Sequence, residues 1–89
     1  MHEYSINTAL ESRHFETEEF EGNYKGIYKY AKLSDVISTL QSLMAEYGDG
    51  YLTIDNEYTD ECGGVDVRDT TFYDSNGEPK KTVRFFHLS

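Results

Sequence analysis

The hydrophobic positions of residues 32–50 recur with the period of an α-helix. In this segment, KLSDVISTLQSLMAEYGDG, the apolar side chains share one helical face, at Leu33, Val36, Ile37, Leu40, Leu43, Met44 and Tyr47. Ser34 is the expected N-cap, Asp35 suits the positive end of the helix dipole, and Gly48 suits the left-handed position after the last turn. The pattern predicts an amphipathic helix that packs its apolar stripe against a sheet.

Alternating apolar and polar residues predict β-strands on both sides of this helix. Residues 3–10, EYSINTAL, alternate in the way that is typical of a half-buried strand. In residues 51–58, YLTIDNEY, Leu52 and Ile54 are expected to face the helix. Because successive side chains of a strand point to opposite faces, the intervening residues are expected on the other face of the sheet. These residues are Tyr51, Thr53, Asp55 and Glu57.

Two turn signals predict β-hairpins. Gly22-Asn23 divides residues 13–31, and residue 21 is expected opposite residue 24. This register pairs Phe15 with Tyr30, Glu16 with Lys29 and Thr17 with Tyr28. Asn76-Gly77 divides residues 65–88, and residue 75 is expected opposite residue 78. This second register pairs Asp69 with Arg84, Val67 with Phe86 and Val65 with Leu88, so that both charges and apolar residues match.

The order of these elements predicts an α+β fold in a single domain, residues 1–89. We expect a single antiparallel β-sheet of about five to six strands with one amphipathic helix on one face. Residues 83–88, VRFFHL, are apolar on both faces. A strand of this kind is either central in the sheet or buried by a dimer, and the central position is the favoured interpretation.

The composition narrows the class of partner. The chain has 89 residues and a formal net charge of −9, which disfavours direct binding to nucleic acid or to an anionic membrane and favours a basic partner. No stretch approaches the roughly 20 apolar residues of a membrane span, and the first residues lack the pattern of a signal peptide. With Cys62 as the only cysteine, the expected location is a reducing cytoplasm, that of a bacterial host cell.

Carboxylates are concentrated in residues 49–69, and catalysis or metal binding is one possible reason. The histidines (His2, His14 and His87) are scattered, and no phosphate loop, HExxH motif or nucleophile elbow is present. Asp55-Asn56-Glu57 resembles the opening of a calcium loop, but the glycine and the closing glutamate of that motif are out of register. We therefore expect no enzyme, no metal site and no cofactor.

The remaining explanations are a solvated surface, which keeps a protein soluble, and a surface that mimics a nucleic acid. Residues on one face of a strand are about 6.6 Å apart, a step similar to the one between backbone phosphates. Carboxylates placed in this way would meet lysine and arginine side chains already arranged for nucleic acid. The expected partner-binding residues are Asp49, Tyr51, Asp55, Glu57, Tyr58, Asp60, Glu61 and Asp66, with the tyrosines as anchors. A second acidic patch is expected at Glu16, Glu18, Glu19 and Glu21.

A small, acidic, tryptophan-free chain without catalytic motifs resembles, as a class, the inhibitors that phages and mobile elements encode. These include anti-CRISPR proteins, anti-restriction proteins and uracil-DNA glycosylase inhibitors. The segment YDSNGEPKKTV, residues 73–83, is similar to the C-terminal hairpin of the last group. The resemblance implies a non-enzymatic inhibitor, in some cases a DNA mimic, that binds a basic nucleic-acid-binding protein or complex and so evades host defence. It assigns no functional residue.

Two other classes fit the same sequence. Immunity proteins and antitoxins are also small and acidic, and many of them neutralise a basic nuclease toxin. The third class is an acidic self-assembling interaction module, so both a monomer and a homodimer remain open. Of these alternatives, the inhibitor of a basic nucleic-acid-binding protein is the favoured hypothesis.

Overall fold

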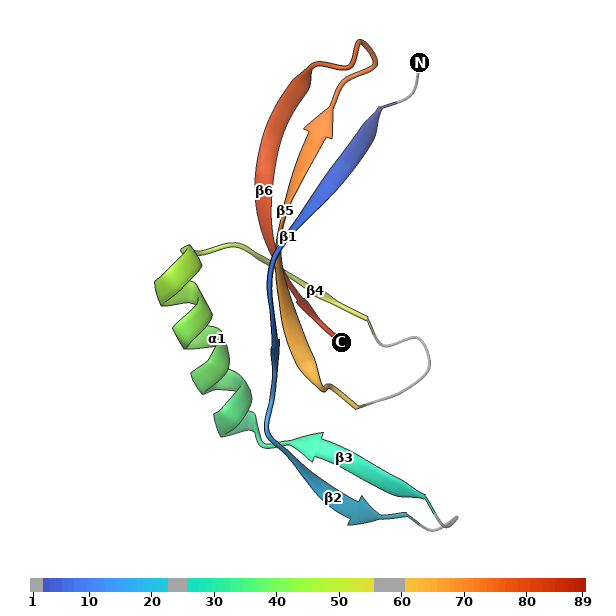
Figure 1. Ribbon diagram of the computed structural model, residues 1–89, viewed down its shortest axis with the longest axis vertical. Coiled ribbons are helices and arrows are strands. Elements are labelled where there is room, and N and C mark those ends of the chain that lie inside the picture. Colours follow the sequence, from blue (N-terminus) through green and yellow to red (C-terminus); the bar gives the residue numbers. More distant parts are fainter. Residues whose placement is uncertain (1–2, 23–25, 56–60) are drawn as a thin grey trace.

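The chain folds into an α+β structure, seen here in a computed structural model that describes residues 3–22, 26–55 and 61–89. The elements follow the order β1 (Tyr4–His14), β2 (Thr17–Glu21), β3 (Ile27–Ala31), α1 (Leu33–Tyr47), β4 (Tyr51–Ile54), β5 (Gly64–Tyr73) and β6 (Pro79–Leu88). Figure 1 shows α1 beside the lower half of a long twisted sheet, whose upper part extends beyond the helix. The α+β class and the number of strands agree with the prediction.

The strands form two sheets, so the predicted single antiparallel sheet is wrong. A four-stranded sheet has the order β1-β5-β6-β4, and β2 pairs only with β3 in a separate two-stranded sheet. The larger sheet is mixed, because β4 runs parallel to β6. The physical reason is that α1 carries the chain back along the sheet before β4 begins, as in other crossover connections. As favoured from its sequence, β6 is central and lies between β5 and β4.

The β5–β6 hairpin has the predicted register over most of its length. Asp69 lies opposite Arg84, and Val67 lies opposite Phe86. The turn is one residue longer than predicted, since Asp74, not residue 75, donates its N–H to the carbonyl oxygen of Glu78, at 2.9 Å. Gly77 has φ of 80°, as expected for a three-residue loop that closes with a glycine bulge. The side chain of Asp74 accepts two further backbone N–H groups and fixes this longer turn.

The β2–β3 hairpin forms, but its predicted register is wrong. Glu21 lies opposite Ile27, and the N–H of Gly22 donates to the carbonyl oxygen of Gly26 at 2.8 Å. The register therefore differs by three residues from the one that Gly22-Asn23 predicted. The cause lies at the base of the hairpin, where Phe15 leaves the strand and enters the core. Burial of a large aromatic side chain outweighs the preference of a short turn.

The helix agrees with the prediction at its C-terminus and differs at its N-terminus. Gly48 has φ of 82° and donates its N–H to the carbonyl oxygen of Met44, as expected for a C-terminal glycine. The predicted N-cap, Ser34, lies within the first turn instead. Lys32 occupies the cap position and makes no side-chain cap hydrogen bond. Packing therefore positions the start of this helix.

The core is small and lies between α1 and the lower half of the sheet. Its buried residues are Phe15, Leu43, Val65, Val67 and Phe86. The predicted apolar stripe of α1 is only partly covered: Val36, Leu40 and Tyr47 pack at the margin of the core. Leu33, Ile37 and Met44 are exposed. Leu52 approaches the helix as predicted, yet both Leu52 and Ile54 are exposed.

Arg84 ties the central strand to its neighbour and to the helix. Its guanidinium donates two hydrogen bonds to the carboxylate of Asp69, at 2.7 and 2.9 Å, and a third to the carbonyl oxygen of Tyr47. The guanidinium also lies 5.8 Å from the centre of the Tyr47 ring. The predicted pairing of Asp69 with Arg84 is thus confirmed, and it also satisfies an unpaired carbonyl at the end of α1.

This ion pair makes stability depend on acidity. Hydrogen bonds from Arg84 lower the pKa of Asp69 below its ordinary value. A lowered carboxyl pKa stabilises the fold above the unfolded value of about 3.9, and this contribution is lost as the pH falls through the folded value. As the pH falls below about 4, we expect the free energy of unfolding to decrease less in Asp69→Asn than in the wild type. Urea unfolding across this pH range tests the prediction, with Glu78→Gln as an exposed carboxylate control. Identical acid dependence in wild type and Asp69→Asn would contradict it.

Candidate partner-binding surface

Two of the predicted acidic residues lie at opposite ends of β4. Asp49 precedes the strand, and its carboxylate accepts the N–H of Gly50 at 2.9 Å. Asp55 follows the strand, and its backbone N–H donates to the carbonyl oxygen of Leu88 at 2.9 Å. Both residues are exposed. Because a whole strand separates them, the two carboxylates belong to the two ends of the sheet edge and not to one cluster.

Two other predicted residues lie on the sheet face that α1 leaves open. The carboxylate of Asp66, in β5, accepts a hydrogen bond of 2.6 Å from the hydroxyl of Ser12 in β1. The Tyr51 ring, in β4, lies 6.2 Å from the ring of Phe85 in β6. One carboxylate oxygen of Asp66 is therefore already hydrogen-bonded to Ser12 within the sheet. Tyr51 packs on the open face. Tyr51 begins β4 and therefore lies close to Asp49, whereas Asp66 lies two strands away in β5.

Glu61 lies beside the small hairpin. Its carboxylate accepts the backbone N–H of Lys29, in β3, at 2.8 Å. The predicted residues Glu57, Tyr58 and Asp60 lie outside the described residues. Among the described residues, the surface predicted around β4 is therefore divided between the two ends of β4, the open sheet face and the small hairpin, and Glu61 belongs with the second acidic patch.

The second acidic patch is presented on the β2–β3 hairpin, which projects from the lower end of the larger sheet in Figure 1. Glu16, Glu18, Glu19 and Glu21 are all exposed. Glu18 forms an ion pair of 3.2 Å with Lys32, and Glu19 lies opposite Lys29. The bond from Lys29 to Glu61 adds a fifth carboxylate at the edge of β3. Residues far apart in the sequence thus form one acidic region around the hairpin.

One face of this hairpin carries an aromatic cluster that the sequence interpretation did not single out. The Phe20 ring lies 5.6 Å from the Tyr30 ring, and the Tyr28 ring lies 6.3 Å from the Tyr30 ring. Phe20 and Tyr28 are both exposed. The signal was present in the sequence, but the wrong register placed Thr17 opposite Tyr28, whereas Phe20 is its partner. We call the five carboxylates (Glu16, Glu18, Glu19, Glu21 and Glu61) with these three aromatic residues the hairpin surface.

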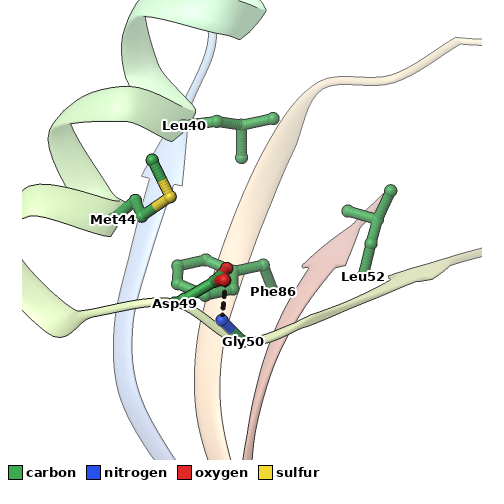
Figure 2. A pocket seen from close by; sticks show the side chains of 6 residues that line it. All are labelled: Leu40, Met44, Asp49, Gly50, Leu52 and Phe86. Carbon is green, nitrogen blue, oxygen red and sulfur yellow. Dashed lines mark hydrogen bonds between the residues drawn. The ribbon is translucent and has the colours of Figure 1, made fainter.

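Catalysis or metal binding would need polar side chains gathered in a pocket. The hydroxyl of Thr53 lies 2.7 Å from Nδ1 of His87, on the open sheet face. The pocket in Figure 2, between α1 and β4, has a volume of about 160 Å³ and an apolar lining. Within the described ranges, no three His, Cys, Asp or Glu side chains gather as metal ligands would.

The geometry therefore defines an α+β protein whose best-presented chemical feature is a projecting acidic and aromatic hairpin. No protein-family model, curated protein or solved structure matches the chain. In the part of the chain that the structure describes, no helix is both long and apolar enough to cross a membrane.

Proposed function

We propose that this chain is a non-enzymatic inhibitor that binds a basic, nucleic-acid-binding protein or complex through the hairpin surface. The observation that carries the proposal is the concentration of five carboxylates and three aromatic side chains on a projecting hairpin. Glu18 lies on the same face of β2 as Phe20, and Glu19 and Glu21 lie on the opposite face. The net charge of −9 favours a basic partner. The contact surface differs from the first choice made from sequence, since the second acidic patch now takes the main role.

The two kinds of side chain would have different tasks. Carboxylates steer a basic partner during the encounter and raise the association rate, and this effect weakens as salt screens the charges. Aromatic side chains supply buried contact area and are frequent among residues that dominate binding energy. Phe20 and Tyr28 are suited to this second task because they are exposed on the face of the hairpin that also carries Glu18. A partner with a nucleic-acid groove offers lysine and arginine side chains for the first task.

The first test is a pull-down from bacterial lysate with the immobilised chain, eluted by a salt ramp and analysed by mass spectrometry. We expect enrichment of one nucleic-acid-binding complex that moderate salt releases and nucleic acid displaces. Enrichment of a toxin nuclease in its place would favour the immunity-protein alternative. Capture of nothing, by a chain with the folded circular-dichroism spectrum, would contradict the proposal for that host.

Charge-neutral variants locate the contact. We expect Glu19→Gln with Glu21→Gln to weaken binding about tenfold, mainly through a slower association rate. The matched control is Glu3→Gln with Glu78→Gln, which removes the same charge from exposed residues at the upper end of the sheet. Surface plasmon resonance with the captured partner measures both rates. Equal weakening by the two double variants would mean that only net charge matters, and would contradict a contact at the hairpin.

A further inference from the structure

The chain exposes more surface than a compact protein of its size. Its accessible surface is 6814 Å², whereas a compact monomer of 10.3 kDa exposes about 5,400 Å². The excess is about 1,400 Å². The radius of gyration agrees, at 16.4 Å against about 12 Å for a compact domain of this length. A stable protein interface covers about 800 Å² of each partner, so the excess is large enough for one.

Much of the exposed apolar surface lies in one place. Leu33, Ile37, Leu40 and Met44 form one row along α1, at the spacing of successive helical turns. Figure 2 shows Leu52 across the pocket from Leu40 and Met44, with Phe86 between them. Ile54 is on the same face of β4 as Leu52, opposite Leu88 of β6. The surface comprises the four residues of the row with Leu52 and Ile54, and five of these six side chains, all but Leu40, are between 45% and 73% exposed. We call these six residues the α1–β4 surface.

The backbone beside this surface is also open. Within the described residues, β4 pairs only with β6 and forms one edge of the sheet. An edge strand with apolar side chains is a template for pairing with another strand. Here an edge strand and an apolar helix row lie next to each other, and one partner can cover both.

We propose that a second copy of this chain covers the α1–β4 surface. The two β4 strands pair antiparallel across a two-fold axis, which joins the two sheets into one continuous sheet. The apolar rows of the two helices, with Leu52 and Ile54 of both copies, fill the space above the joined edges. None of the six residues is ionisable, so the surface itself adds no repulsion between copies.

The small core favours a second copy over a different protein. Five buried apolar residues among residues 3–22, 26–55 and 61–89 are few for a domain of this size. A second copy is always present with the chain, so dimerisation stabilises the fold before any target is met. A different protein would stabilise the fold only where that protein is present. The proposal does not rest on the function of the hairpin surface, which lies at the lower end of the molecule in Figure 1.

The charges predict that this dimer becomes more stable as the salt concentration rises. Each copy carries −9, and Asp49 and Asp55 lie at the two ends of the pairing strand. Antiparallel pairing brings carboxylates of one copy near those of the other. Added salt should therefore strengthen the dimer, because it screens this repulsion. Binding of a basic partner at the hairpin surface should weaken with salt, so the two proposals are distinguishable.

Sedimentation equilibrium of the purified chain at several concentrations and salt levels tests the proposal. We expect a monomer–dimer equilibrium that moves toward dimer as salt is added, and a further shift toward dimer in Asp55→Asn. Ile37→Glu with Leu52→Glu should abolish the dimer. Leu10→Glu, on the opposite sheet edge in β1, should leave the dimer intact. A wild-type monomer at all concentrations, or a dimer that only Leu10→Glu disrupts, would overturn the proposal.

Amide hydrogen exchange covers the case in which the glutamate variants fail to fold. In the wild type, the backbone amides of β4 should exchange faster as the protein is diluted below its dimerisation constant, while those at the centre of β5 change less. Exchange in β4 that is independent of concentration, in a protein that sediments as a dimer, would place the interface elsewhere and overturn the proposal.

Discussion

Leu43→Ala is expected to lower the free energy of unfolding by about 3 kcal/mol. Leu43 is fully buried, and it is the only helix residue in the five-residue core. The change removes the contact between α1 and the sheet strands at Val65, Val67 and Phe86. Since small domains have roughly 5–15 kcal/mol of stability in total, the loss is a large fraction of it.

Urea unfolding followed by far-ultraviolet circular dichroism measures this effect. Ser42→Ala is the matched control, because it changes the neighbouring exposed residue of the same helix to the same residue. Alanine has a higher helix propensity than serine, so the control should be as stable as the wild type or slightly more so. A Leu43→Ala variant that unfolds at the same urea concentration as Ser42→Ala would show that the helix is not held by this core.

Gly50→Ala is expected to lower the free energy of unfolding by about 1–3 kcal/mol. A Cβ atom at this position would lie 2.6 Å from the carbonyl oxygen of Arg84 and 2.8 Å from a ring carbon of Phe86. A backbone carbonyl in the central strand cannot move aside without disturbing the pairing of β6 with its neighbours. The substitution should therefore push the start of β4 away from the sheet.

Gly63→Ala is the control for this second variant. Its Cβ would lie 3.8 Å from its nearest neighbour, the carbonyl oxygen of Ser89, which is an ordinary contact. We expect Gly63→Ala to unfold at the wild-type temperature and Gly50→Ala to unfold several degrees lower. Differential scanning calorimetry compares them. Equal melting temperatures of the two variants would contradict the close approach of residue 50 to the central strand.

The elements that could be predicted from sequence are those whose partners are near in the chain. The β5–β6 register followed from matching Asp69 with Arg84 and Val67 with Phe86, and both pairs are confirmed. The β2–β3 register failed because Phe15 is drawn into a core made by residues far along the chain. A turn signal contains no information about that core, so it cannot fix the register when tertiary packing opposes it.

The apolar stripe of α1 shows a related limit. Periodicity identified the helix and its C-terminal glycine, but it could not tell which part of the stripe the sheet would cover. Leu43 is buried, whereas Ile37 is exposed. Only the position of β4 as an edge strand, which depends on its nonlocal pairing with β6, decides this.

The candidate site was limited in the same way. Alternation along a strand showed that Tyr51 and Asp55 differ in direction from Leu52, but it gave no information on neighbouring strands. The hydrogen bond from the backbone N–H of Lys29 to the carboxylate of Glu61 joins residues that are distant in sequence, and it places Glu61 beside the hairpin. For this reason the sequence supplied the acidic residues but not the surface that they form.

The central place of β6 has a consequence for how the chain folds during synthesis. Both β5 and β4 hydrogen-bond to β6, yet β4 ends at Ile54 and β6 begins only at Pro79. A nascent chain that has just emerged through residue 54 therefore holds β4 without its partner strand, and β1 still without β5. The four-stranded sheet must then assemble after translation of residues 64–88, in one late step that joins distant segments. Until that step, the apolar residues of α1 and β4 are exposed to chaperones and to neighbouring nascent chains.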